Sequence, residues 1–243
     1  MNPAATPTPL VDVHGDERWM SIHQRFVSQA RELEPDVLLV GDSLLANLQS
    51  SELWESWFAP LHTMNLAIGG DQTQHVLWRL QNGELEYIQP KVIVVLVGTN
   101  NHEHSVDQVA DGIMEICNTI TEKLPTADIL LLTLLPRGQK PNHLREKHKK
   151  INGLISEAAK ALDRIQVVNL DKDIIQSDGS ISHRDMYDYL HLSHQGYRRI
   201  FEPLHELLSQ MLHGDDSKLV NEIVAATHST LPSPSDNPQP AEQ

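Results

Sequence analysis

Three residue types that together can perform serine-based acyl transfer stand far apart in this sequence. Ser43 ends the triplet Gly41-Asp-Ser43, which follows the apolar run 37–40, while Asp188 and His191 lie three positions apart near the other end of the chain. A serine attacks an ester carbonyl when a histidine removes its proton and a carboxylate orients that histidine. The pattern predicts Ser43 as nucleophile, His191 as general base and Asp188 as orienting acid.

Each of these residues also has a structural interpretation. A serine between a strand and a helix commonly caps the helix, and Leu45 stands where the Gly-x-Ser-x-Gly elbow has its second glycine. We interpret Asp42 as the cap or as a buttress of the turn. The chain has 14 histidines, so the presence of His191 alone indicates little. Asp185 remains a second candidate for the orienting acid.

Two further clusters follow predicted strands. Gly69-Gly70 comes after one strand, and Gly98-Thr-Asn100 after another. Because the carboxyl ends of parallel strands gather at one edge of a sheet, we expect both clusters to lie near Ser43. The Gly70 N–H, the Asn100 side chain and the Ser43 N–H would then form an oxyanion hole. Ordinary turns or caps are the alternative at both clusters.

Strands and helices alternate along the chain. Short apolar runs bounded by Pro, Asp, Gly or Asn are typical of buried strands, and they occur at 36–40, 63–67, 91–97, 128–133 and 165–169. The intervening segments are long enough for crossover helices, at 44–57, 72–82, 105–123 and 142–162, with further helices at 18–33 and 192–212. The alternation predicts an α/β protein, a three-layer α/β/α fold around a five-stranded parallel sheet.

The chain divides into one folded domain and two flanking segments. We predict that the domain spans residues 16–213. The Pro-rich residues 1–15 are expected to form an extended N-terminal segment. Residues 214–243 end in a Pro- and Ser-rich stretch and are expected to be a disordered tail, with at most a short helix over Lys218–Ala226.

Composition excludes several classes of function. The net charge of −14 argues against a broad nucleic-acid-binding face. The basic segment 140–150 is interpreted as a solvated helix face, the alternative being a local site for an acidic partner or phosphate groups. The single cysteine, Cys117, is expected to be a buried thiol and fits a cytoplasmic protein. We find no signal peptide and no transmembrane segment in the sequence.

Metal and cofactor chemistry find no support in the motifs. His102-Glu-His104 lacks the i, i+4 histidine spacing of a zinc helix. Glycine-rich loops of the dinucleotide-binding or phosphate-binding type are absent from the sequence. We therefore expect neither a metal nor a cofactor.

The catalytic blocks resemble those of a known family. In order along the chain, Gly41–Ser43, Gly70, Gly98–Asn100 and Asp188–His191 resemble the four blocks of the SGNH (GDSL-like) hydrolases. The wider stretches 69–80, 97–102 and 134–138 are similar to the catalytic alpha subunits of the intracellular type I platelet-activating factor acetylhydrolases.

The resemblance implies a flavodoxin-like fold and a cofactor-free serine esterase that removes the sn-2 acetyl group of platelet-activating factor, an acetylated phospholipid. It implies a homo- or heterodimer with a related alpha subunit, and a WD-repeat, lissencephaly-associated regulatory subunit as partner. It assigns the nucleophile, base and acid as above, and the oxyanion hole to Ser43, Gly70 and Asn100. Beside these residues, we expect the acyl pocket to be shaped by Leu44, Thr99 and Leu190. The alternatives are an esterase for another acetylated substrate and a scaffold that binds the WD-repeat subunit.

Overall fold

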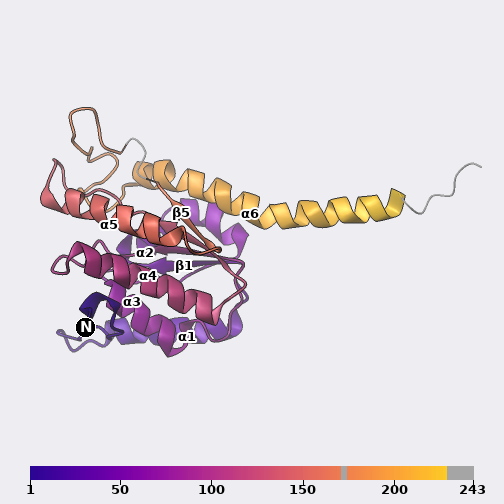
Figure 1. The fold of residues 1–243 in the computed structure, drawn as a ribbon, viewed down its shortest axis with the longest axis horizontal. Coiled ribbons are helices and arrows are strands. Elements are labelled where there is room, and N and C mark those ends of the chain that lie inside the picture. The colour runs from indigo at the N-terminus through magenta and orange to yellow at the C-terminus, as the bar shows by residue number, and fades with distance from the viewer. Residues whose placement is uncertain (171–173, 229–243) are drawn as a thin grey trace, which may run out of the picture.

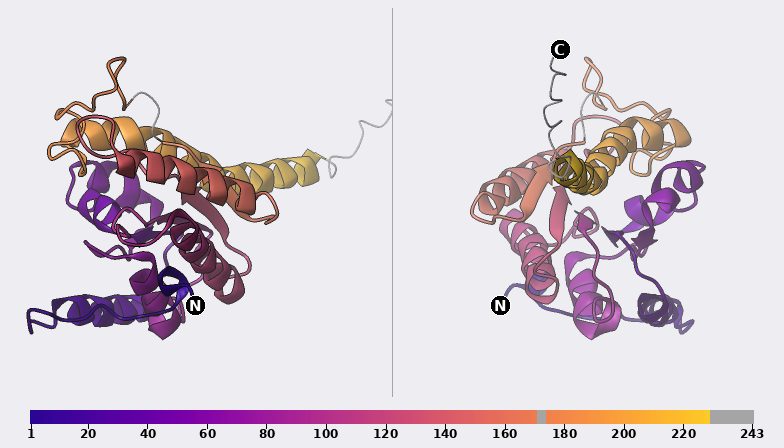
Figure 2. Two further views of the ribbon diagram at one scale, coloured as in Figure 1. Left: turned by 60° about the vertical axis from the view of Figure 1, so that its left-hand side comes forward. Right: turned by 90° about the vertical axis from the view of Figure 1, so that its right-hand side faces the viewer.

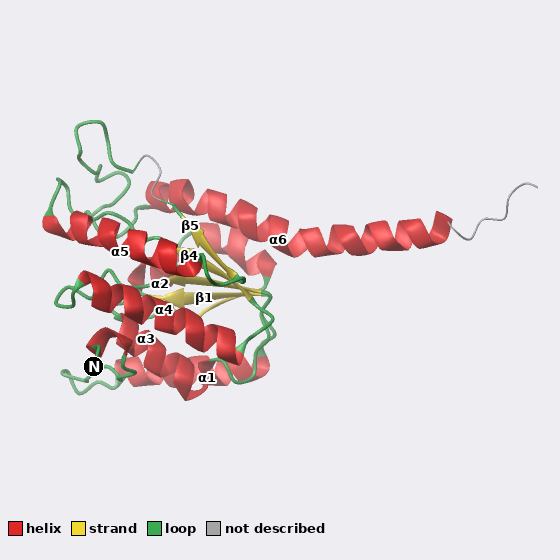
Figure 3. Ribbon diagram, in the orientation of Figure 1, coloured by secondary structure: helices red, strands yellow, loops and turns green. Residues whose placement is uncertain are grey.

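The computed structural model describes residues 1–170 and 174–228, with residues 215–228 as helix backbone only. Its centre is a parallel five-stranded sheet of order β2-β1-β3-β4-β5 (Figure 3). The strands are β1 (Val37–Gly41), β2 (Thr63–Asn65), β3 (Val92–Leu96), β4 (Asp128–Leu132) and β5 (Ile165–Val168). All five predicted strands are present, and the predicted α/β class is confirmed.

The end of β1 is placed by a close backbone approach. β1 and β3 are buried along their whole length, as expected for strands covered on both faces. The register pairs Val37 with Val92 and Gly41 with Leu96. A Cβ atom at Gly41 would lie 2.1 Å from the Leu96 carbonyl oxygen. Only glycine therefore fits here, and it fixes where the chain leaves the sheet toward Ser43.

Helices cover both faces of the sheet (Figures 1 and 2). On one face α3 (Thr73–Arg79), α4 (Val106–Lys123) and α5 (His143–Ala159) pack side by side. On the other face lie α2 (Ser43–Leu48) and α6 (His194–His228), joined where the Tyr197 hydroxyl donates to the Leu44 carbonyl at 2.8 Å. The first helix, α1 (Arg18–Glu32), lies beside α3, with Trp19 packed on Trp78.

Three helices differ in length from the prediction. α3 ends at Arg79 rather than at residue 82, and a π-helical turn follows it at Leu80–Glu84. α2 ends at Leu48, well short of residue 57, because Ser51 closes the last turn through its N–H and hydroxyl, both bonded to the Leu48 carbonyl. A separate π-helical turn follows at Trp54–Phe58. α6 continues to His228 and includes the segment Lys218–Ala226, where we expected a tail with a short helix at most. Residues 229–243 lie outside the described residues, so the domain division stays a prediction.

Part of the N-terminal stretch 1–15, which we expected to be extended, is helical. Pro3–Ala5 is a turn of 3₁₀ helix in which Ala4 is fully buried. The turn forms because the Asn2 side chain accepts the Ala4 N–H at 3.0 Å and so caps it. Cys117 is buried, as predicted, and burial raises the pKa of its thiol to about 12. Within the described part of the chain, no helix is both long and apolar enough to cross a membrane.

Candidate active site

Three side chains from distant parts of the sequence meet beyond the carboxyl end of β1. Ser43 Oγ lies 3.0 Å from His191 Nε2. On the other side of the imidazole, Nδ1 lies 2.7 Å from Asp188 Oδ2. When Nδ1 donates its proton to the carboxylate, Nε2 is left as an acceptor for the serine proton. The structure thus brings together all three residues predicted as nucleophile, base and acid.

A tight turn presents the base and the acid. An antiparallel bridge between Met186 and Leu192 closes its base. Asp188 Oδ1 accepts the N–H of Leu190 at 3.0 Å and that of His191 at 2.7 Å, which leaves Oδ2 for the imidazole. Partial burial raises the pKa of Asp188, but its hydrogen bonds to the His191 ring and to these backbone groups outweigh that effect and hold the pKa below its ordinary value. The acid is therefore ionised at neutral pH.

Ser43 is the first residue of α2, and the helix cap is its neighbour. Asp42 Oδ1 accepts the Leu44 N–H at 3.0 Å, which agrees with the role expected for Asp42 and leaves the Ser43 hydroxyl for His191. The Ser43 N–H belongs to the first turn of the helix and has no intrahelical acceptor. Burial raises the pKa of Asp42 to about 7.

The two predicted oxyanion clusters lie at the same edge of the sheet as Ser43. A Cβ atom at Gly69 would be 3.8 Å from the Ser43 Cβ atom, so the glycine turn lies against the serine. Gly70 has a φ of 85°, and no acceptor among the described residues takes its N–H. Asn100 Nδ2 donates to the Asp71 carbonyl at 2.9 Å, which ties the two loops together and leaves a second amide hydrogen available.

Two cationic side chains hold the loop that carries Asn100. Arg137 Nη1 donates to the Thr99 carbonyl at 3.0 Å and to the Thr99 hydroxyl at 3.2 Å. Lys147 Nζ donates to the Asn101 carbonyl at 2.8 Å and to two further carbonyls of the same loop. Lys147 belongs to the basic segment 140–150 that we interpreted as a solvated helix face, but its ammonium group binds this loop instead. Arg137 was assigned no role, although it lies within one of the stretches that carry the family resemblance. The sequence did contain a signal for Arg137, because this arginine follows the apolar residues directly after a strand, where functional side chains gather.

A fully buried ionic cluster underlies the turn with the exposed glycines. Arg79 donates through Nε to Asp71 at 2.9 Å and through Nη1 to Glu84 at 2.5 Å. Trp19 Nε1 donates to Asp71 at 2.7 Å, and His23 Nδ1 lies 2.9 Å from Glu84. Burial raises the pKa of Asp71 to about 6 even though Arg79 acts in the opposite direction. The cluster fixes the residue that directly follows Gly70.

The remaining sequence candidates are placed as follows. Asp185 pairs with Arg199 at 3.3 Å rather than with His191, so it is not the orienting acid in this arrangement. Leu44 and Thr99 are buried and Leu190 is half-buried. Their grouping into an acyl pocket stays a prediction.

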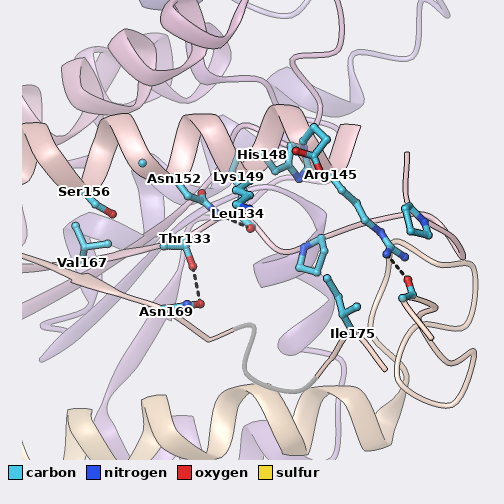
Figure 4. A pocket seen from close by; sticks show the side chains of 15 residues that line it. Thr133, Leu134, Arg145, His148, Lys149, Asn152, Ser156, Val167, Asn169 and Ile175 are labelled. Atoms are coloured by element: carbon cyan, nitrogen blue, oxygen red, sulfur yellow. Dashed lines mark hydrogen bonds between the residues drawn. The ribbon is translucent and has the colours of Figure 1, made fainter. Parts of the chain in front are cut away.

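The most voluminous of the cavities described for this structure lies apart from the triad. It measures about 810 Å³ and opens between α5 and the ends of β4 and β5 (Figure 4). Its lining includes Thr133, Arg145 and His148 and none of the triad residues. The Arg145 guanidinium is already bonded to three backbone carbonyls, and His148 Nδ1 to another at 2.8 Å. The catalytic chemistry therefore belongs to the Ser43 edge.

Comparison with solved structures agrees with this fold. A GDSL-like lipase from Bacteroides thetaiotaomicron superposes with a TM-score of 0.67 at 16% identity, covering 77% of this chain and 97% of that one. Est24, a carbohydrate acetylesterase from Sinorhizobium meliloti, superposes with a TM-score of 0.57 at 15% identity, covering 73% of this chain and 100% of that one.

Sequence comparison identifies nearer relatives. Platelet-activating factor acetylhydrolase IB subunit alpha1 of Homo sapiens is 51% identical over 217 residues, 89% of this chain and 94% of that protein. Subunit alpha2 of the same enzyme from Rattus norvegicus is 53% identical over 211 residues, which are 87% of this chain and 92% of that protein. The model of the GDSL-like Lipase/Acylhydrolase family matches residues 39–199, a span that includes Ser43 and His191. The chain therefore belongs to the GDSL-like lipase and acylhydrolase family and is a serine ester hydrolase.

Proposed function

We propose that this protein hydrolyses the sn-2 acetyl ester of platelet-activating factor and related acetylated phospholipids, through an acyl-enzyme on Ser43. The observation that carries the proposal is the hydrogen-bonded series in which Ser43 Oγ lies 3.0 Å from His191 Nε2 and His191 Nδ1 lies 2.7 Å from Asp188. The choice of substrate rests on relatives at about half identity that are named for this acetylhydrolase activity.

In the first half-reaction Ser43 Oγ attacks the acetyl carbonyl carbon while its proton passes to His191 Nε2. Asp188 stabilises the imidazolium through the bond to Nδ1. The carbonyl oxygen becomes an oxyanion, and the N–H groups of Ser43 and Gly70 and the Asn100 amide are the donors that receive it. As the tetrahedral intermediate collapses, the ester C–O bond breaks and the leaving glycerol oxygen takes the proton from His191.

The second half-reaction returns the enzyme to its starting state. His191 removes a proton from water, the hydroxide attacks the acetyl carbonyl, and acetate leaves as Ser43 Oγ regains a proton. No step requires a metal or a cofactor. Leu44, Thr99 and Leu190 adjoin catalytic residues in the sequence, and we assign them to the pocket that receives the methyl group of the acetyl chain.

The setting of the activity is also part of the proposal. The relatives are named as subunits of a larger enzyme, which supports assembly of this chain as a homo- or heterodimer with a related alpha subunit. From the family resemblance of the catalytic blocks we further propose that the assembled subunits bind a WD-repeat regulatory protein and act in the cytoplasm.

Labelling with a fluorophosphonate, read by intact mass, tests the nucleophile. We expect one adduct on the wild type and none on Ser43→Ala. Because Asp42 supplies the helix cap, the substitution removes only the hydrogen bond to His191 and should change the free energy of unfolding by about 1 kcal/mol. A folded wild-type protein that takes up no probe would refute the proposal. If the probe reacts but acetylated phospholipids are not hydrolysed, only the choice of substrate is wrong.

A further inference from the structure

The first eight residues lie on α3 and α4 through specific hydrogen bonds. Asn2 Nδ2 donates to the Gln108 carbonyl at 3.1 Å, while Asn2 Oδ1 caps the turn that buries Ala4. Further along, the Thr8 N–H donates to the Gln74 carbonyl at 3.1 Å. We call residues 2–8 the N-terminal segment. Among the described residues, none of the hydrogen bonds of this segment involves the catalytic triad, so we look for an influence on catalysis through α3 and α4.

The helix beneath the N-terminal segment leaves room for it. A Cβ atom at Gly112, in the interior of α4, would lie 2.4 Å from the Ala4 carbonyl oxygen and 2.7 Å from Thr73 Oγ1. Glycine inside a helix is less favourable than alanine by about 1 kcal/mol. Glycine at this position thus lowers the stability of α4 but leaves room for Ala4.

A short hydrogen-bond series leads from Ala4 to the loop that carries Asn100. The Thr73 hydroxyl donates to the Ala4 carbonyl at 2.7 Å and accepts from Asn101 Nδ2 at 3.1 Å. Asn101 Oδ1 in turn accepts the Thr73 N–H at 3.1 Å. A hydroxyl has one hydrogen, so its donation to Ala4 leaves its lone pairs facing Asn101. One residue away, Gln72 Nε2 donates to the Asn100 carbonyl at 2.9 Å.

These bonds join the two loops that present the oxyanion donors. Gln72 and Thr73 directly follow the Gly69–Asp71 turn, and Asn101 directly follows Asn100. Thr73 and Asn101 are buried to more than nine-tenths, with exposed fractions of 0% and 1%. Removing the Ala4 carbonyl would turn the Thr73 hydroxyl toward another acceptor, either the Gln74 side-chain oxygen at 3.5 Å or water. Either change would alter the bond between Thr73 and Asn101.

We propose that the N-terminal segment positions the oxyanion hole, because it completes the Thr73–Asn101 pair that fixes Gly70 relative to Asn100. The proposal rests on the oxyanion roles given under the proposed function. Complete removal of an oxyanion donor typically lowers turnover by about 10²–10³-fold. Loosening two donors that remain present should cost less, about tenfold in kcat. KM should change by less than about twofold, because the donors bind the transition state more strongly than the substrate.

Two glycine substitutions give a matched test without shortening the chain. Gly112→Ala places a methyl group against the bond between the Ala4 carbonyl and the Thr73 hydroxyl, and it should lower kcat about tenfold. Gly153→Ala is the control, because Gly153 is also inside a helix but its Cβ atom would meet nothing within 4 Å. The control should retain wild-type kcat. In both variants the acid limb of the pH–rate profile should keep its midpoint, since the Ser43–His191–Asp188 contacts are unchanged.

Truncation and peptide addition provide a second test. A chain lacking residues 1–9 should show the same loss of kcat, and a synthetic peptide of residues 2–10 should restore its rate. The peptide should not restore Gly112→Ala, because the methyl group occupies the site. Thr73→Val should lower kcat like the truncation, whereas Thr73→Ser, which retains the hydroxyl, should not. The comparison of Thr73→Val with Thr73→Ser tests the proposal even if the truncated chain does not fold.

The outcomes separate this proposal from the proposed function. Wild-type kcat in the truncated chain or in Gly112→Ala would overturn the positioning role. A change that appears only in KM would also overturn it. So would a truncated chain that the peptide does not restore together with a Thr73→Ser variant that loses as much kcat as Thr73→Val. A wild-type protein that is folded but neither reacts with fluorophosphonate nor hydrolyses acetyl esters would instead refute the proposed function. The expected result is a selective loss of kcat with the triad still reactive and the pH midpoint unmoved.

Discussion

Asp188→Asn tests the orienting role of this acid with the smallest possible change. The asparagine oxygen can still accept the two backbone N–H groups that Asp188 Oδ1 binds at 3.0 and 2.7 Å. The turn should therefore persist. The altered group is the one that faces His191 Nδ1 at 2.7 Å. An amide nitrogen there must donate, which forces Nδ1 to accept and moves the imidazole proton to Nε2, where it opposes Ser43.

The size of the effect follows from charge and exposure. The substitution removes both the favourable tautomer and the negative charge that stabilises the imidazolium. The Asp188 side chain is 42% exposed, so water can replace part of that stabilisation. We therefore expect kcat to fall by about 10²–10³-fold, equivalent to about 3–4 kcal/mol in the activation barrier.

Steady-state hydrolysis of an acetyl ester at pH 7.5, together with urea unfolding, measures the effect. Asp185→Asn is the control, because that carboxylate lies on the same loop but pairs with Arg199; it should affect stability more than kcat. The reasoning is refuted if Asp188→Asn retains kcat within about threefold of the wild type at unchanged stability. A larger loss of kcat from Asp185→Asn would instead assign the orienting role to Asp185.

Three other changes test separate parts of the structure. Arg79→Met leaves the carboxylates of Asp71 and Glu84 buried without their cation, so urea unfolding should show a loss of about 3–5 kcal/mol; a loss below about 1 kcal/mol would contradict the pairing. Burial lowers the pKa of His148 from 6.5 to about 4. The folded state therefore binds fewer protons than the unfolded state in this window, and stability should fall as the pH drops from 6.5 toward 4, by on the order of 3 kcal/mol from this group. His148→Asn should flatten that slope, and equal slopes in the two proteins would exclude His148 as its source. Leu190→Ala should raise kcat/KM for a butyryl ester relative to an acetyl ester, and an unchanged ratio would exclude Leu190 from the acyl pocket.

Much of the fold was predictable because the strands combine two local signals. Each is a short apolar run, and each is bounded by Pro, Asp, Gly or Asn, as at Gly41 and Gly98. The spacing of Asp188 and His191 was similarly informative, since a single turn suffices to join them. Ser43 could not be separated from a helix cap by sequence alone, because the outcome depends on which of two adjacent side chains accepts the Leu44 N–H.

The features that escaped prediction depend on contacts between distant segments. The N-terminal residues have the composition of an extended segment, and their burial depends on a glycine more than a hundred positions away, Gly112. Arg79 follows Trp78 in a helix, and arginine is a charged residue type that usually lies at the surface. Its burial requires Trp19 and His23 of another helix to complete the cluster with Asp71 and Glu84. Periodicity within one helix carries no information about such partners.

The bond from the Tyr197 hydroxyl to the Leu44 carbonyl joins the two distant parts of the catalytic triad, because Ser43 begins α2 and His191 lies just before α6. A chain is synthesised from its N-terminus and its parts can fold as they emerge, so Ser43 is present long before His191. Until α6 packs beside α2, the serine has no base and reacts as an ordinary alcohol. Labelling of Ser43 by an activity-based probe therefore reports that the C-terminal part of the chain, which carries His191, has packed beside α2.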